Sequence, residues 1–143
     1  MIATVYSNTQ PTTFAIDKIA DGVAKFAIRT NITQVPTTDP VTGTPTEQWQ
    51  YSETQMVVTA DTGEDIDLMR SARDVLLANV DYLTTRYLEQ SALVTGDALT
   101  ATTMTAAQYQ ALLVYKQGLR DLSHHFTTLA AIVWPEPPAG INP

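Results

Sequence analysis

The stretch D-T-G-E-D-I-D-L-M-R-S-A-R-D-V-L-L-A-N-V-D-Y-L-T-T-R-Y, residues 61–87, decides the fold, because the spacing of apolar side chains changes there. Long or apolar side chains now recur every three or four positions, as on one face of a helix. They are Ile66, Met69, Arg73, Leu76, Val80, Leu83 and Tyr87. Neither glycine nor proline interrupts residues 65–92. This predicts a helix of about 27 residues, roughly 40 Å long, that either spans the whole body or breaks near Asp81-Tyr82.

The start of this helix is marked by Thr62-Gly63-Glu64-Asp65, a capping threonine with an acid three residues later. Acidic side chains are favoured near a helix N-terminus by the helix dipole. The same acids resemble a calcium-binding loop, but the EF-hand spacing D-x-D-x-D-G is absent. We therefore interpret the stretch as a helix start.

The chain before residue 61 is predicted to form strands. Residues 2–6 are a short apolar run, and residues 23–32 alternate, with Phe26 and Ile28 on one face and Lys25 and Arg29 on the other. Residues 48–58 are a second extended run. Between these runs, residues 33–48 contain three prolines and a glycine, which predicts a long loop between two antiparallel strands.

The chain after residue 92 is predicted to hold a linker, a second helix and an irregular tail. Residues 93–103 are the linker, and Thr105 with Gln108 forms a capping box that opens a helix ending around residues 123–126. Four prolines follow Trp134 within the last nine residues, so residues 130–143 are expected to run extended, in polyproline-like geometry.

These patterns predict an α+β fold, with an N-terminal antiparallel β-sheet followed by two α-helices and a Pro-rich extended C-terminal tail. Residues 1–60 form the β-rich part and residues 61–143 the helical part with its tail. A chain of 143 residues is long enough for one domain with a substantial core. We expect the two parts to form one compact domain.

Composition and motifs argue against several function classes. The formal net charge is −7, which disfavours nucleic acid and anionic membranes as partners. No apolar run is long enough for a membrane span, and no secretory signal is visible. Cysteine is absent, and the adjacent His124 and His125 cannot grip one metal ion as a pair one helical turn apart can. No motif for a nucleophile, nucleotide or metal site occurs. We predict no enzyme activity, no cofactor and no metal.

Three short blocks in the C-terminal half resemble the phage tail assembly chaperone family. The first is R-S-A-R-D-V-L-L, residues 70–77, followed by Asp81-Tyr82. The second is Y-K-Q-G-L-R-D-L, residues 115–122, in which Lys116 stands where members usually carry arginine. The third is Trp134-Pro135-Glu136-Pro137. The blocks occur in the family's order and cover roughly residues 68–138.

The resemblance implies a non-enzymatic protein that binds tail-fibre or tail-tip subunits and assists their folding or attachment. It would act in the host cytoplasm during assembly. A structural component that stays in the virion tail, such as a fibre cap or connector, is the alternative, and self-association into a homo-oligomer is left open. The strand-rich first 60 residues would be specific to this phage and would dock the fibre.

The candidate residues follow from these blocks and from the aromatic side chains. The expected partner-binding residues are Trp49, Tyr51, Trp134, Pro135 and Pro137. Trp134 allows two interpretations: its indole plugs a groove on its own chain, or it anchors a partner. The expected structural motif consists of Arg73, Asp74, Tyr115, Leu119, Arg120 and Asp121. Of these, Leu119 is expected to lie in the core, on a stripe with Leu112 and Leu122.

Overall fold

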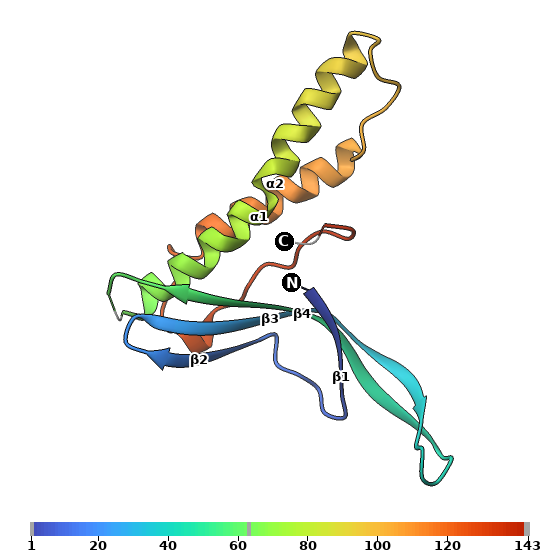
Figure 1. Ribbon diagram of the computed structural model, residues 1–143, viewed down its shortest axis with the longest axis vertical. Helices are drawn as coiled ribbons and strands as arrows, with labels where there is room; N and C mark the ends of the chain where they lie inside the picture. Colours follow the sequence, from blue (N-terminus) through green and yellow to red (C-terminus); the bar gives the residue numbers. More distant parts are fainter. Residues whose placement is uncertain (1, 63, 142–143) are drawn as a thin grey trace. The chain divides into compact units, whose positions relative to one another are not determined.

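A computed structural model describes residues 2–62 and 64–141 (Figure 1). The elements are β1 (Ile2–Ser7), β2 (Phe14–Ala20), β3 (Val23–Thr38), β4 (Pro45–Thr59), α1 (Asp65–Thr95), α2 (Ala106–Asp121) and the single-turn 3-10 helix η1 (Leu129–Ala131). The strands form one antiparallel sheet in the order β1-β4-β3-β2. The predicted α+β fold, a sheet followed by two helices, is confirmed.

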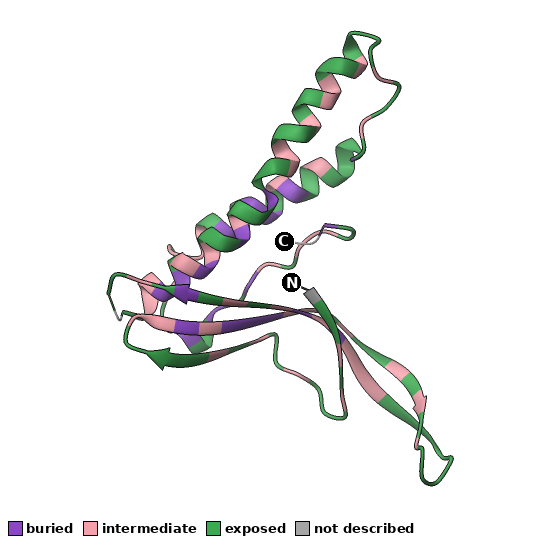
Figure 2. Ribbon diagram, viewed as in Figure 1, coloured by how far each residue is buried: buried purple, intermediate pink, exposed green. Residues whose placement is uncertain are grey.

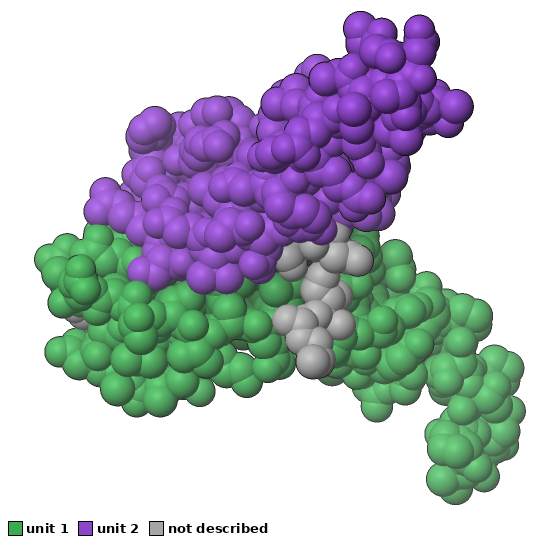
Figure 3. Space-filling view, turned by 45° about the horizontal axis from the view of Figure 1, so that its top comes forward, with its two compact units in different colours: residues 1–68 green, residues 69–143 purple. Residues whose placement is uncertain are grey.

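The chain divides into two compact units, Met1–Leu68 and Met69–Pro143 (Figure 3). The first unit holds the sheet and the first turn of α1. The second holds the rest of α1, with α2 and the tail. Whether both units act as one domain, as the sequence suggests, stays a prediction.

The strand β2 was not predicted, and it pairs with β3 through a two-residue turn. Ala20 lies opposite Val23, so Asp21 and Gly22 form the turn. Gly22 has a φ of +68°, which glycine adopts without strain. A Cβ at Gly22 would also lie 2.7 Å from the carbonyl oxygen of Ala60. The turn therefore requires glycine at position 22 for two reasons: its backbone conformation and the lack of space for a side chain.

The long loop predicted over residues 33–48 is wrong. β3 and β4 continue to pair from Thr33 opposite Gln50 to Thr38 opposite Pro45. Only residues 39–44 form the connection, and Figure 1 shows β3 and β4 leaving the sheet as a two-stranded ribbon. Beyond the last β1 pair, Ser7 opposite Trp49, only β3 and β4 remain, and we call this ribbon, residues 35–48, the arm. The prolines misled the prediction because a proline is excluded only where its nitrogen must donate to a neighbouring strand.

The register of the arm explains why its prolines are tolerated. At the tip, the N–H of Asp39 donates to the carbonyl of Thr44 at 2.9 Å. The backbone N–H and C=O groups of this pair therefore point toward the partner strand. In an antiparallel ladder, such pairs alternate with pairs whose N–H groups point outward. Counting from Asp39 opposite Thr44, the pairs Pro36–Glu47 and Pro45–Thr38 are ones in which the backbone nitrogens point away from the partner strand. Neither proline removes a hydrogen bond between the two strands.

The predicted alternation of β3 holds for its inner half and stops at a bulge. Phe26 and Ile28 are buried as expected. Asn31 has a φ of +55°, and the register with β4 shifts between Thr30 and Thr33. Thr30 still pairs regularly with Ser52, and residues 31 and 32 form the bulge. The alternation ends there, because a bulge adds a residue on one strand and reverses the faces beyond it.

The helix α1 is continuous through Asp81-Tyr82, which settles the two alternatives in favour of an unbroken helix. Its 31 residues correspond to a length of about 46 Å. It runs to Thr95, so the expected linker from residue 93 starts too early. Glu64 rather than Thr62 precedes the helix, and its carbonyl accepts from Leu68 at 3.2 Å. The expected capping stretch also includes Gly63, which lies outside the described residues.

The second helix begins as predicted. The hydroxyl of Thr105 accepts from the N–H of Gln108 at 3.2 Å, and the Gln108 side chain accepts from the N–H of Thr105 at 2.9 Å. This reciprocal pair is the capping box. α2 ends at Asp121, earlier than expected, so His124 and His125 follow the helix instead of lying in its last turn.

The cores of both units are visible in Figure 2 as the buried positions. In the second unit they recur every three or four residues: Met69, Ala72, Leu76 and Val80 on α1, and Leu112, Tyr115 and Leu119 on α2. No described residue of α1 beyond Val80 is buried. Instead, Tyr87 stacks on Tyr109 of α2 with ring centroids 4.1 Å apart.

Candidate partner-binding site

A buried lysine joins the two helices of the second unit. The Nζ of Lys116 lies 2.7 Å from Asp81 Oδ1 and donates to the Thr84 hydroxyl at 2.9 Å. The Lys116 side chain is 7% exposed, whereas that of Asp81 is 58% exposed. The lysine therefore buries its methylene stem and reaches its partners near the surface. Asp81 follows the first sequence block and Lys116 belongs to the second, so this pair connects the two.

The third block meets the second at a glycine. Gly118 lies inside α2, where glycine costs about 1 kcal/mol relative to alanine. A Cβ at this position would lie 3.3 Å from Pro135 Cβ. The absence of a side chain therefore allows the tail to approach the helix closely. Residues 132–138 contain neither helix nor strand. Ile132 and Trp134 are buried while Val133 is 82% exposed, the alternation of an extended segment.

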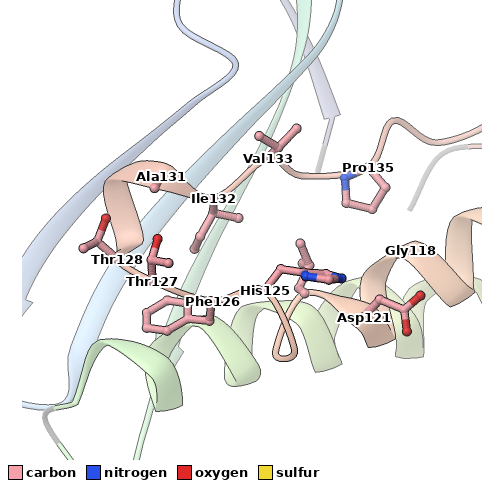
Figure 4. Close-up of a pocket in the computed structure, with 11 residues that line it drawn as sticks. Gly118, Asp121, His125, Phe126, Thr127, Thr128, Ala131, Ile132, Val133 and Pro135 are labelled. Atoms are coloured by element: carbon pink, nitrogen blue, oxygen red, sulfur yellow. The ribbon is translucent and has the colours of Figure 1, made fainter.

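The tail and the end of α2 enclose a groove of about 330 Å³ (Figure 4). Figure 4 shows Ile132 of the tail on one side and Phe126 and His125 on the opposite side, with the Val133 side chain pointing away from them. The lining consists of Gly118, Asp121, Leu122, His125, Phe126, Thr127, Thr128, Ala131, Ile132, Val133 and Pro135. Apolar side chains predominate in this set. We call it the tail groove.

The charge in the tail groove comes from Asp121. Its carboxylate accepts a hydrogen bond from the Gln117 side chain at 2.9 Å. The nearest basic group in the described contacts is His124, with Nδ1 3.9 Å from Asp121 Oδ1, and this imidazole is charged only when protonated. Asp121 therefore presents a negative charge beside an apolar surface. Such a surface is complementary to a polypeptide that carries apolar side chains together with a positively charged side chain.

The structure distributes the predicted partner-binding residues over both units. Trp134 is 6% exposed in the isolated chain, which supports packing on its own chain over a free anchor. Pro135 lines the tail groove, and Pro137 is half-buried. In the sheet, Trp49 is half-buried and Tyr51 is buried. Partner contacts by these residues stay predictions.

Tyr51 belongs to a cross-strand cluster in the sheet. The Arg29 guanidinium lies 5.6 Å from the centre of the Tyr51 ring and donates from Nε to Glu53 at 2.8 Å. Burial opposes ionisation of Glu53, but hydrogen bonds from Gln55 and Arg29 outweigh it and lower the pKa of this carboxyl. The cluster stabilises the pairing of β3 with β4.

The predicted motif residues divide between core and surface. Tyr115 and Leu119 are buried, and burial raises the pKa of Tyr115 to about 12. Arg73 pairs with its neighbour Asp74 at 2.7 Å, and Arg120 is exposed. Asp121 lines the groove. Sequence reasoning missed Gly118 and the partnership of Lys116 with Asp81. The sequence did hold one signal for Gly118: a glycine inside a predicted helix often marks a place where another part of the chain packs closely against that helix.

A comparison with known protein families finds a match. The family described as phage tail assembly chaperone protein matches residues 66–139. The chain belongs to the phage tail assembly chaperone family. The matched residues include all three blocks, the Lys116–Asp81 pair and the tail groove. No curated protein and no solved structure matches the chain.

Membership in this chaperone family indicates a role in phage tail assembly, and such chaperones are generally not enzymes. Among residues 2–62 and 64–141, no group of three or more His, Asp or Glu side chains is placed to hold a metal ion. No helix in that part of the chain is long and apolar enough to cross a membrane.

Proposed function

We propose that this chaperone-family protein binds a tail-fibre or tail-tip subunit in the host cytoplasm and assists its folding or attachment. The observation that supports this most is the tail groove. Two of the three family blocks line it, through Gly118 and Asp121 on α2 and Pro135 on the tail. Asp81, which follows the remaining block on α1, holds Lys116 of α2 in place.

The size and chemistry of the tail groove suit transient binding to a polypeptide. A volume of about 330 Å³ lies at the lower end of the range of ligand pockets. Burying one large aliphatic or aromatic side chain contributes about 1.5–3 kcal/mol. A groove that admits one or two such side chains gives a reversible complex. Reversibility is what a protein that releases its client after assembly requires.

The experiment is co-expression of the untagged chain with an affinity-tagged tail-fibre or tail-tip subunit from the same phage. We expect the chain to co-purify with that subunit and to be absent from purified virions by mass spectrometry. Presence in virions at a fixed ratio to the fibre would favour the permanent structural component instead. Failure to co-purify with any tail protein, under conditions where both partners fold, would contradict the proposal.

A further inference from the structure

Among the residues that the structure describes, three of the four free edge regions of the sheet carry features that block pairing with another strand. The outer edge of β2 contains Asp17 and Lys18, and its register is broken between Lys18 and Ala20. Bulges and charged side chains on an edge strand are common devices against edge-to-edge pairing. Lys18 also forms an ion pair with Asp65. β2 is therefore poorly suited to accept a further strand.

The two outer edges of the arm are blocked by proline. Pro36 on β3 and Pro45 on β4 occupy outward-facing pairs of the ladder, as the register from the tip shows. Each removes a backbone donor from the edge that an incoming strand would need. Both strands of the arm are protected in the same way, one on each side.

The outer edge of β1 carries none of these features. Its sequence, I-A-T-V-Y-S, contains no proline and no charged residue. Its pairing with β4 runs without a register shift from Ile2 to Ser7. Within the described residues, β4 is its one neighbour in the sheet. Thr4 is exposed and Tyr6 is 57% exposed, so β-branched and aromatic side chains, which favour strands, stand at this edge.

From this contrast we propose that β1 is a self-association edge, at which a second copy of the chain adds its own β1 in antiparallel orientation. Pairing about a two-fold axis uses the same edge in both copies and leaves neither edge open. A strand from a different protein would cover β1 but bring an edge of its own. The paired sheet has eight strands, four from each copy.

The charge distribution favours a second copy at this edge. A chain with a formal charge of −7 repels its copies over most of its surface. Like charges directly opposite each other destabilise a strand pair. β1 is uncharged along its whole length, so two copies meet there without opposing charges. The strand has only six residues, which makes the dimer weak and dependent on protein concentration.

The test is sedimentation velocity of the untagged chain over a wide range of concentrations. We expect reversible dimers that Thr4→Lys weakens about tenfold or more, because lysines on an edge strand repel across the two-fold axis. The matched control is Thr46→Lys on the exposed, proline-protected edge of β4, which should leave the dimer unchanged. Both variants lower the net negative charge equally. A loss confined to Thr4→Lys therefore reports on the edge and not on overall charge.

A second readout keeps the test decisive if Thr4→Lys fails to fold. The chain has no cysteine, so Thr4→Cys and Thr46→Cys can each be labelled with pyrene. Excimer fluorescence is expected at position 4 and not at position 46. A wild-type chain that stays monomeric at the highest soluble concentration would overturn the proposal. Excimer at position 46 instead of position 4 would overturn it as well.

Discussion

The ion pair between Lys116 and Asp81 predicts an asymmetry between its two members. Lys116 is 7% exposed and Asp81 is 58% exposed. Asp81→Asn leaves a buried ammonium group with the Thr84 hydroxyl as its described acceptor. Breaking a fully buried pair costs about 3–5 kcal/mol. Because water reaches the Asp81 carboxylate, we expect a smaller loss, about 1–3 kcal/mol of unfolding free energy.

Substitution of the other member of the pair, Lys116, should lower the unfolding free energy less. Lys116→Met keeps the apolar stem of the side chain and removes the group that must be kept from water. Asp81 can then be hydrated where it stands, since more than half of its side chain is exposed. We expect a loss within about 1 kcal/mol. In the double variant, Lys116→Met should recover most of the stability that Asp81→Asn loses, because no unpaired charge remains buried.

Urea unfolding followed by circular dichroism at the helix band measures these differences. The slope of the unfolding curve should stay constant, so that the midpoint reports stability. Asp81→Asn should lower the melting temperature by about 3–10 °C. Glu89→Gln, on an exposed position of the same helix, is the control for removing a surface carboxylate. A loss for Lys116→Met equal to or larger than that for Asp81→Asn would refute the reasoning.

Three further predictions concern single side chains. Leu119→Ala should destabilise the chain by about 2–5 kcal/mol, because Leu119 is fully buried; an unchanged urea midpoint would contradict this. With its pKa raised to about 12 from 10.0, Tyr115 contributes stability that is complete below pH 10.0 and falls by about 3 kcal/mol towards pH 12. Tyr115→Phe should flatten that alkaline decline in melting temperature. The lowered pKa of Glu53 contributes stability above its unfolded pKa that is lost as the pH falls through the folded value. Glu53→Gln should therefore make acid unfolding less steep.

The helical unit followed closely from the sequence because local signals and packing agree there. The Thr105 and Gln108 capping box fixes the start of α2, and the three–four spacing of apolar residues identifies both helices. The interior of α1 lacks any residue that would break it, so it continues past Asp81-Tyr82. The error at the start of α1 arose because several acids and a threonine offer competing caps within a few residues.

The sheet was harder because strand assignment depends on neighbours that are distant in sequence. The prolines of the arm led to the prediction of a loop. Whether Pro36 and Pro45 disrupt strand pairing depends on which way each nitrogen points, and this follows only from the register. β2 carries few buried side chains, so its pattern is weak. The Asp21-Gly22 turn was the signal that could have revealed it, as Asp-Gly between extended runs is typical of hairpins.

The site was predictable in its parts and not in its assembly. Arg73, Tyr115, Asp121 and Trp134 were singled out from short blocks. No local pattern shows that Gly118 and Pro135 meet, because this contact closes a loop between α2 and the tail. Membership in the family likewise identifies the blocks without showing that two of them line one groove.

The most direct test of the proposed function is the affinity of the chain for its tail-fibre or tail-tip subunit after a charge is placed in the tail groove. His125 lines the groove and is exposed, and Val114 on α2 is 73% exposed outside it. Substitutions at such exposed positions usually change stability by no more than about 0.5 kcal/mol. Isothermal titration calorimetry should show at least a tenfold loss of affinity for His125→Asp and no loss for Val114→Asp, with both melting temperatures unchanged. Equal affinities for His125→Asp and the wild type would contradict partner binding through the tail groove.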